Sequence, residues 1–132
     1  MTYGMDTSVI LRIITSEPYP LAEKVQTRVA EIIAAGGEFV ISELPAFEAY
    51  YSLQHFYGRT KEEAIMALRA LADEDGISFS PEAAAALATP DAWKANPGFV
   101  DRMIVAGYAA HGHGTFSCEK VFRRLPGTEI LP

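Results

Sequence analysis

Short apolar runs alternate along the chain with longer segments in which apolar residues recur every three or four positions. The short runs predict β-strands at Tyr3–Asp6, Phe39–Ile41, Ile77–Phe79, His113–Ser117 and Thr128–Leu131. The periodic segments predict helices at Ser8–Ser16, Leu21–Ala35, Glu43–Tyr57, Thr60 to about Glu74, an alanine-rich stretch from Ser80, and Phe99–His111. Strands that alternate with helices are typical of an α/β domain, so we expect a mostly parallel central sheet flanked by helices.

Capping signals mark several of these helix boundaries. Ser42 immediately precedes a predicted helix whose first turn holds Glu43, and it is expected to cap that helix. Thr60 and Glu63 have the spacing of a capping box, in which each side chain accepts a hydrogen bond from the other residue's backbone N–H.

Length and composition predict one domain over residues 1–132. The hydrophobic fraction of 49% is enough for a full core. No basic, apolar leader and no run of about 18 apolar residues occurs, so we expect neither a signal peptide nor a membrane span. The single cysteine, Cys118, excludes an internal disulfide and suits the cytoplasm, and we expect it to be a small packed side chain. The net charge of −6 argues against a protein that coats nucleic acid, so any such contact must be local.

Four acidic residues lie at or just beyond the ends of predicted elements. Asp6 ends the first strand and Glu43 follows the second, while Asp101 lies in the first turn of its helix and Glu119 follows the strand that ends at Ser117. Sites in parallel α/β sheets form outside the carboxyl ends of the strands, so we expect these acids to converge on one edge. Oxygen-only donors suit Mg²⁺ or Mn²⁺, because zinc and copper usually recruit His or Cys. The alternative interpretation is that the acids are helix caps or surface charges.

Hydroxyl groups stand next to two of the acids. Thr7, Ser8 and Ser117 either orient a phosphate or a carboxylate, or cap backbone groups, and the sequence supports both interpretations.

Aromatic residues gather in the segment after Glu43. They exceed what one helix face needs for its own core, and an interface with a subunit or partner is favoured over base stacking. They are Phe47, Tyr50, Tyr51, Phe56 and Tyr57.

The local motifs around the four acids, in their order along the chain, resemble the PIN domain, and within it the small toxin ribonucleases of VapC type. The motifs are MDTSVIL, ISELPAFEAYYSL, FVDRMIVAGYAAHG and SCEKVFRRLPGTEIL, and the resemblance covers nearly the whole chain. It is weakest between about Gly58 and Gly98, where only the general character agrees.

Two registers remain open for the fourth acid. The family usually has Asp in a Thr-Phe-Asp turn, and a direct match of Thr115-Phe116 puts Ser117 at the acid position. Counting without gaps from Asp101 places Glu119 there instead, and Phe122 then also falls where the family has it. We prefer the second register, which leaves Glu where Asp is usual.

The resemblance implies a PIN-like three-layer fold and a metal-dependent endoribonuclease, the toxin of a type II toxin-antitoxin pair. Asp6 and Asp101 would hold Mg²⁺ or Mn²⁺, with Glu43 and Glu119 as further ligands, directly or through water. It also implies a VapB-like antitoxin as partner and a homodimer.

Two other functions compete with this one. A PIN-like module that binds RNA or a protein partner without cutting is consistent with the altered fourth acid. A phosphoacceptor receiver domain has similar length and an acidic Mg²⁺ pocket. It would show paired acids after the first strand and a lysine near the last strand, and this chain has neither.

Overall fold

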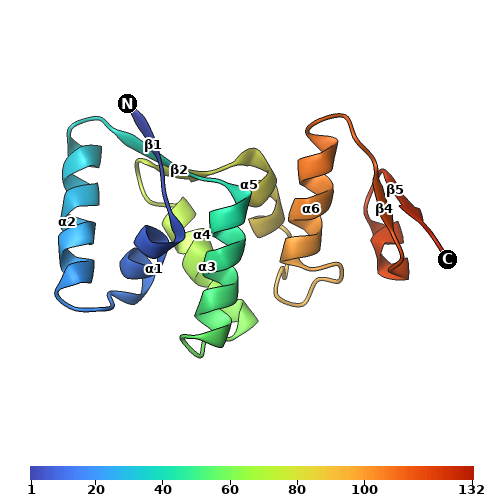
Figure 1. Ribbon diagram of the computed structural model, residues 1–132, viewed down its shortest axis with the longest axis horizontal. Helices are drawn as coiled ribbons and strands as arrows, with labels where there is room; N and C mark the ends of the chain where they lie inside the picture. The colour runs from blue at the N-terminus through green and yellow to red at the C-terminus, as the bar shows by residue number, and fades with distance from the viewer. The chain divides into compact units, whose positions relative to one another are not determined.

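The computed structural model describes all of residues 1–132, which form two compact units: an N-terminal unit, Met1–Ser80, and a C-terminal unit, Pro81–Pro132 (Figure 1). The mixed α/β class, with parallel strands and flanking helices, is confirmed, and the strands form two sheets, one in each unit.

The N-terminal unit contains a three-stranded parallel sheet in the order β1-β2-β3. Its elements are β1 (Thr2–Gly4), α1 (Thr7–Thr15), α2 (Leu21–Ala34), β2 (Glu38–Ile41), α3 (Glu43–His55), α4 (Lys61–Ala72) and β3 (Ile77–Phe79). In the sheet register Gly4 pairs with Val40, and Ile41 pairs with Phe79. The three strands therefore end close to the same level, at one carboxyl edge.

The helices of this unit pack in a chain of neighbours. Helix α1 packs against α2 and α3, α3 packs against α4, and α4 packs against β3. The largest fully buried side chains come from β2 and from helices α1, α3 and α4: Ile10, Ile41, Leu53, Ile65 and Leu68. Burial of these side chains packs the helices and the sheet against one another. This packing holds the ends of the strands in place.

The predicted helix caps give two different outcomes. The capping box is confirmed: Glu63 N donates to Thr60 Oγ1 over 3.1 Å, and Thr60 N donates to Glu63 Oε1 over 2.9 Å. The backbone and side-chain hydrogen bonds with Thr60 lower the pKa of Glu63. Ser42 does stand at the N-cap of α3, but the side-chain cap predicted there is wrong, because its hydroxyl makes no capping hydrogen bond.

The C-terminal unit pairs its two strands with each other. It consists of α5 (Pro81–Leu87), α6 (Phe99–Ala109), β4 (Thr115–Ser117), the 3-10 helix η1 (Lys120–Arg124) and β5 (Thr128–Ile130). Thr115 pairs with Thr128 in the parallel β4-β5 sheet. Val105, Phe122 and Leu125 form a buried cluster that joins α6 to η1. No helix of either unit is both long enough and apolar enough to cross a membrane.

Candidate active site

Asp6 and Glu43 follow neighbouring parallel strands of the N-terminal unit. Met5 N donates to Val40 O over 3.0 Å, which continues the β1-β2 ladder to the residue before Asp6. Glu43 follows Ile41, the last residue of β2, by two positions and is the first residue of α3. The two acids therefore leave the sheet at the same carboxyl edge, as the sequence predicted for this pair.

Asp6 is the N-cap of α1 rather than the last residue of a strand. Its Oδ2 accepts hydrogen bonds from Ser8 Oγ at 2.8 Å and from Ser8 N at 3.3 Å. The hydroxyl and the backbone N–H of Ser8 hold the pKa of Asp6 below its ordinary value. The Asp6 carboxylate thus stays ionised to a lower pH than an ordinary Asp. Both hydrogen bonds from Ser8 are accepted by the same oxygen, Oδ2. The Ser8 hydroxyl thus orients a carboxylate, the first of the two sequence interpretations, and the backbone N–H of Ser8 is itself capped by Asp6.

Glu43 has a hydroxyl partner that the sequence interpretation missed. Ser80 Oγ donates to Glu43 Oε1 over 2.6 Å, and both residues are partly buried. Ser80 directly follows β3, the third strand of the sheet. The sequence carries a signal for this role, since a polar residue stands directly after a short apolar strand.

Thr7 contacts a different acid. Its Oγ1 donates to Glu48 Oε2 over 3.2 Å, which links α1 to α3. In this structure Thr7 therefore joins two helices, and the carboxylate that it orients is neither Asp6 nor Glu43.

Asp101 and Glu119 belong to the C-terminal unit. Asp101 is partly buried in the first turn of α6, near the partial positive charge of the helix N-terminus, as predicted. Glu119 is exposed at the N-cap position of η1, and its side chain makes no capping bond. Its backbone N donates to Ser117 Oγ over 3.0 Å, so the Ser117 hydroxyl caps a backbone group.

The donors present fit a hard divalent cation. Asp6 and Glu43 offer carboxylate oxygens from one sheet edge, and all four residues predicted for the site are carboxylates, so the predicted donor set contains oxygen alone. No group of three or more His, Cys, Asp or Glu side chains in the structure is assembled as a metal site. The four acids divide as one pair in each unit, and their convergence stays a prediction.

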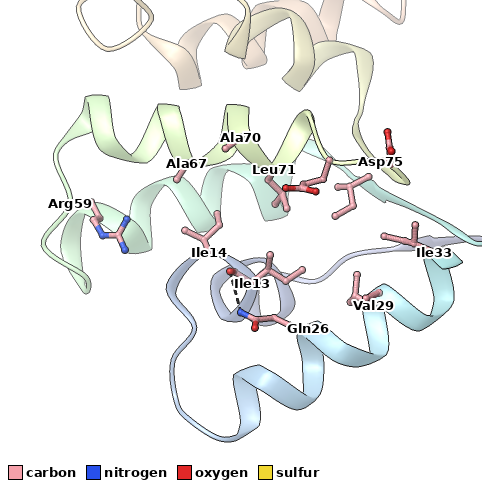
Figure 2. A pocket seen from close by; sticks show the side chains of 13 residues that line it. Ile13, Ile14, Gln26, Val29, Ile33, Arg59, Ala67, Ala70, Leu71 and Asp75 are labelled. Atoms are coloured by element: carbon pink, nitrogen blue, oxygen red, sulfur yellow. Dashed lines mark hydrogen bonds between the residues drawn. The ribbon is translucent and has the colours of Figure 1, made fainter.

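A groove with a volume of about 390 Å³ opens in the N-terminal unit between α1, α2, α4 and β3 (Figure 2). Its wall is largely apolar and includes Ile13, Ile14, Val29, Ile33, Leu71 and Ile77. Arg59 lies at one end and Asp75 at the other, and Glu74 also lines the groove. Gln26 Nε2 donates to Arg12 O over 3.1 Å and so holds α2 against α1 beside the groove.

Several aromatic residues of α3 and the turn after it reach solvent. Phe47, Tyr51 and Phe56 are 36%, 47% and 76% exposed, and the Tyr51 ring contacts both other rings, with centroids 6.1 and 6.4 Å away. Tyr50 is partly buried, and burial raises its pKa.

The prediction that Cys118 is packed is wrong, because this thiol is exposed.

Among solved structures, the chain is similar to one in the crystal structure of VapBC2 from Rickettsia felis bound to a DNA fragment from their promoter. The TM-score is 0.44 and the identity 16%, over 99% of this chain and 98% of that chain. No curated protein matches. The PIN domain family matches residues 3–127, nearly the whole length, and on that ground the chain belongs to the PIN domain family.

Proposed function

We propose that this PIN domain is a metal-dependent endoribonuclease, the VapC-type toxin of a type II toxin-antitoxin pair, acting in the cytoplasm. The observation that carries the proposal is the family match over residues 3–127, with Asp6 and Glu43 at neighbouring strand ends of the same sheet. PIN domains are generally nucleases. Family membership also removes the phosphoacceptor receiver domain from consideration.

In the proposed site, Asp6 and Asp101 hold Mg²⁺ or Mn²⁺, and Glu43 and Glu119 complete the ligand set, directly or through water. When bound, such a cation supplies positive charge that polarises a phosphodiester and stabilises the departing oxygen. A carboxylate that does not hold the cation accepts the proton of the attacking water. Ser8 and Ser80 donate to Asp6 and Glu43 respectively and so restrict how these two carboxylates turn.

The test is cleavage by the purified protein. We expect RNA to be cut with Mg²⁺ or Mn²⁺, and not in excess EDTA, while DNA of the same sequence stays intact. Binding of RNA without any cleavage under all metal conditions would favour the non-catalytic module. Cleavage that persists in EDTA would contradict the metal-dependent mechanism.

We further propose that the apolar groove takes an amphipathic helix of a VapB-like antitoxin whose tail is basic. The groove wall is largely apolar and carries two acids, Glu74 and Asp75, against one cation, Arg59, and the chain carries a net charge of −6. An apolar helix face matches the wall, and Lys or Arg in the adjoining tail complements the acidic groups.

Ala70→Glu tests this partner. Ala70 is exposed on α4 and lines the groove, so a Glu there puts an unpaired charge in the path of an apolar helix. We expect the affinity for a cognate VapB-like antitoxin to fall at least about tenfold, which is a loss of about 1.4 kcal/mol. Ala84→Glu, at an exposed position of α5, is the matched control. Equal affinities of the two variants would contradict binding in the groove.

We also propose a homodimer that uses the exposed aromatic residues of α3. Leu44, Phe47 and Tyr51 stand three and four residues apart, which places them along one helix face. An isologous dimer would cover the same patch on both subunits.

Light scattering at micromolar concentration is expected to report twice the mass of one chain. Tyr51→Ser should shift the protein toward the monomer, because it removes a large apolar side chain from the patch. Tyr19→Ser changes a tyrosine outside α3 that is 79% exposed, more than Tyr51 is, and it should leave the dimer intact. A wild-type monomer, or a Tyr51→Ser variant that dimerises as wild type does, would rule out this interface.

A further inference from the structure

We propose that Ser80 is a positioning residue that orients the carboxylate of Glu43. The observation is the 2.6 Å hydrogen bond from Ser80 Oγ to Glu43 Oε1, which joins the ends of β3 and β2. Its consequence for cation binding rests on the proposed function, whereas the orienting contact itself does not.

The backbone of Ser80 is held next to the end of β2. Ile41 pairs with Phe79 in the parallel register, and Ser80 N donates to Ile41 O over 2.8 Å, one residue beyond the last strand pair. This bond fixes the backbone of Ser80 beside Ile41, which precedes Glu43 by two residues. The Ser80 hydroxyl therefore reaches the carboxylate from the end of a paired strand rather than from a loop.

The contact has the chemistry of an orienting interaction. A hydroxyl that donates to an ionised carboxylate makes a charge-assisted bond, typically about 2.5–2.7 Å long, and the Ser80 contact is in that range. A Glu side chain has three rotatable bonds, so a fixed donor restricts the rotamers that the carboxylate samples. Partners that fix a metal ligand in this way typically contribute about 10–100-fold to metal affinity.

Asp6 has a corresponding partner at the same edge. Ser8 Oγ donates to Asp6 Oδ2 over 2.8 Å. Each of the two predicted site acids in the N-terminal unit thus accepts from a serine hydroxyl, Ser8 from the first turn of α1 and Ser80 from the end of β3. The Ser8 contact is local in sequence, whereas the Ser80 contact spans 37 residues and depends on the β2-β3 pairing.

The first experiment needs no metal. In the metal-free full chain, the Glu43 carboxyl ¹³C resonance and its side-chain couplings are compared between wild type, Ser80→Ala, Ser80→Gly and Ser80→Thr. We expect rotamer averaging of Glu43 to increase in Ser80→Ala and Ser80→Gly, and Thr to restore the wild-type values. Ser78→Ala, on the exposed side of β3, is the control and should change nothing. Unchanged Glu43 couplings in Ser80→Ala would overturn the proposal.

The second experiment measures Mn²⁺ binding by calorimetry together with the melting temperature. We expect the Kd for Mn²⁺ to rise about tenfold in Ser80→Ala and in Ser80→Gly. Glycine is tolerated at the residue before a helix, so Ser80→Gly separates the hydroxyl's effect from any effect on the start of α5. Wild-type affinity in both variants overturns the role of Ser80 toward the cation. A wild-type protein that binds no Mn²⁺ overturns the proposed function instead, and the metal-free couplings still decide whether Ser80 orients Glu43.

Discussion

Replacing Asp6 or Asp101 by Asn is expected to abolish metal-dependent RNA cleavage, with kcat/KM lowered by about 10²-fold or more. Each substitution keeps the size of the side chain and removes one negative charge from the proposed cation site. The charge stabilisation that a catalytic cation supplies is several kcal/mol, and each 1.36 kcal/mol of lost stabilisation is a factor of about ten in rate.

The measurement is single-turnover cleavage of one RNA at saturating and at limiting Mg²⁺. Asp73→Asn is the matched control, because Asp73 is exposed at the end of α4, before β3 begins, and so lies on the amino side of the sheet. Asp6→Asn also changes the N-cap of α1, but Asn caps helices about as well as Asp, so the folded structure should persist. Full activity in either Asp6→Asn or Asp101→Asn would remove that residue from the site.

Glu119→Gln is expected to lower kcat/KM at least tenfold more than Ser117→Ala does. If Glu119 is the fourth acid, its neutral isostere weakens cation binding, and the loss should be larger at limiting Mg²⁺. Ser117→Ala removes the hydroxyl that accepts the Glu119 backbone N–H over 3.0 Å, which loosens the turn but leaves every acid in place.

The same pair of variants decides between the two registers. The reverse order, with Ser117→Ala more damaging than Glu119→Gln, would show that the Thr115-Phe116 match is correct and that the site holds three carboxylates. Glu119 is exposed, and Ser117→Ala removes one hydrogen bond, so neither substitution should change the melting temperature by more than a few degrees. That measurement accompanies the kinetics.

Features that depend on neighbours in the chain could be predicted from the sequence. Strands at Phe39–Ile41 and Ile77–Phe79, the helices between them, and the Thr60–Glu63 capping box all follow from short-range periodicity and capping chemistry, and all are present. The positions of Asp6 and Glu43 just after parallel strands follow in the same way. The boundary error at Asp6 has a local cause: its side chain accepts from Ser8 N, so it belongs to the helix rather than to the strand.

Contacts between residues far apart in the chain required the folded structure. The Ser80–Glu43 hydrogen bond arises only when β2 and β3 pair in one register, and a shift of one residue would turn Ser80 to the other face. The apolar groove exists because α1, α2, α4 and β3 come together, and the division of the strands between two sheets arises because β4 pairs with β5. Local pattern thus specifies which residues stand at strand and helix ends, whereas the partners that those residues meet depend on strand register and helix packing, which no short window of sequence contains.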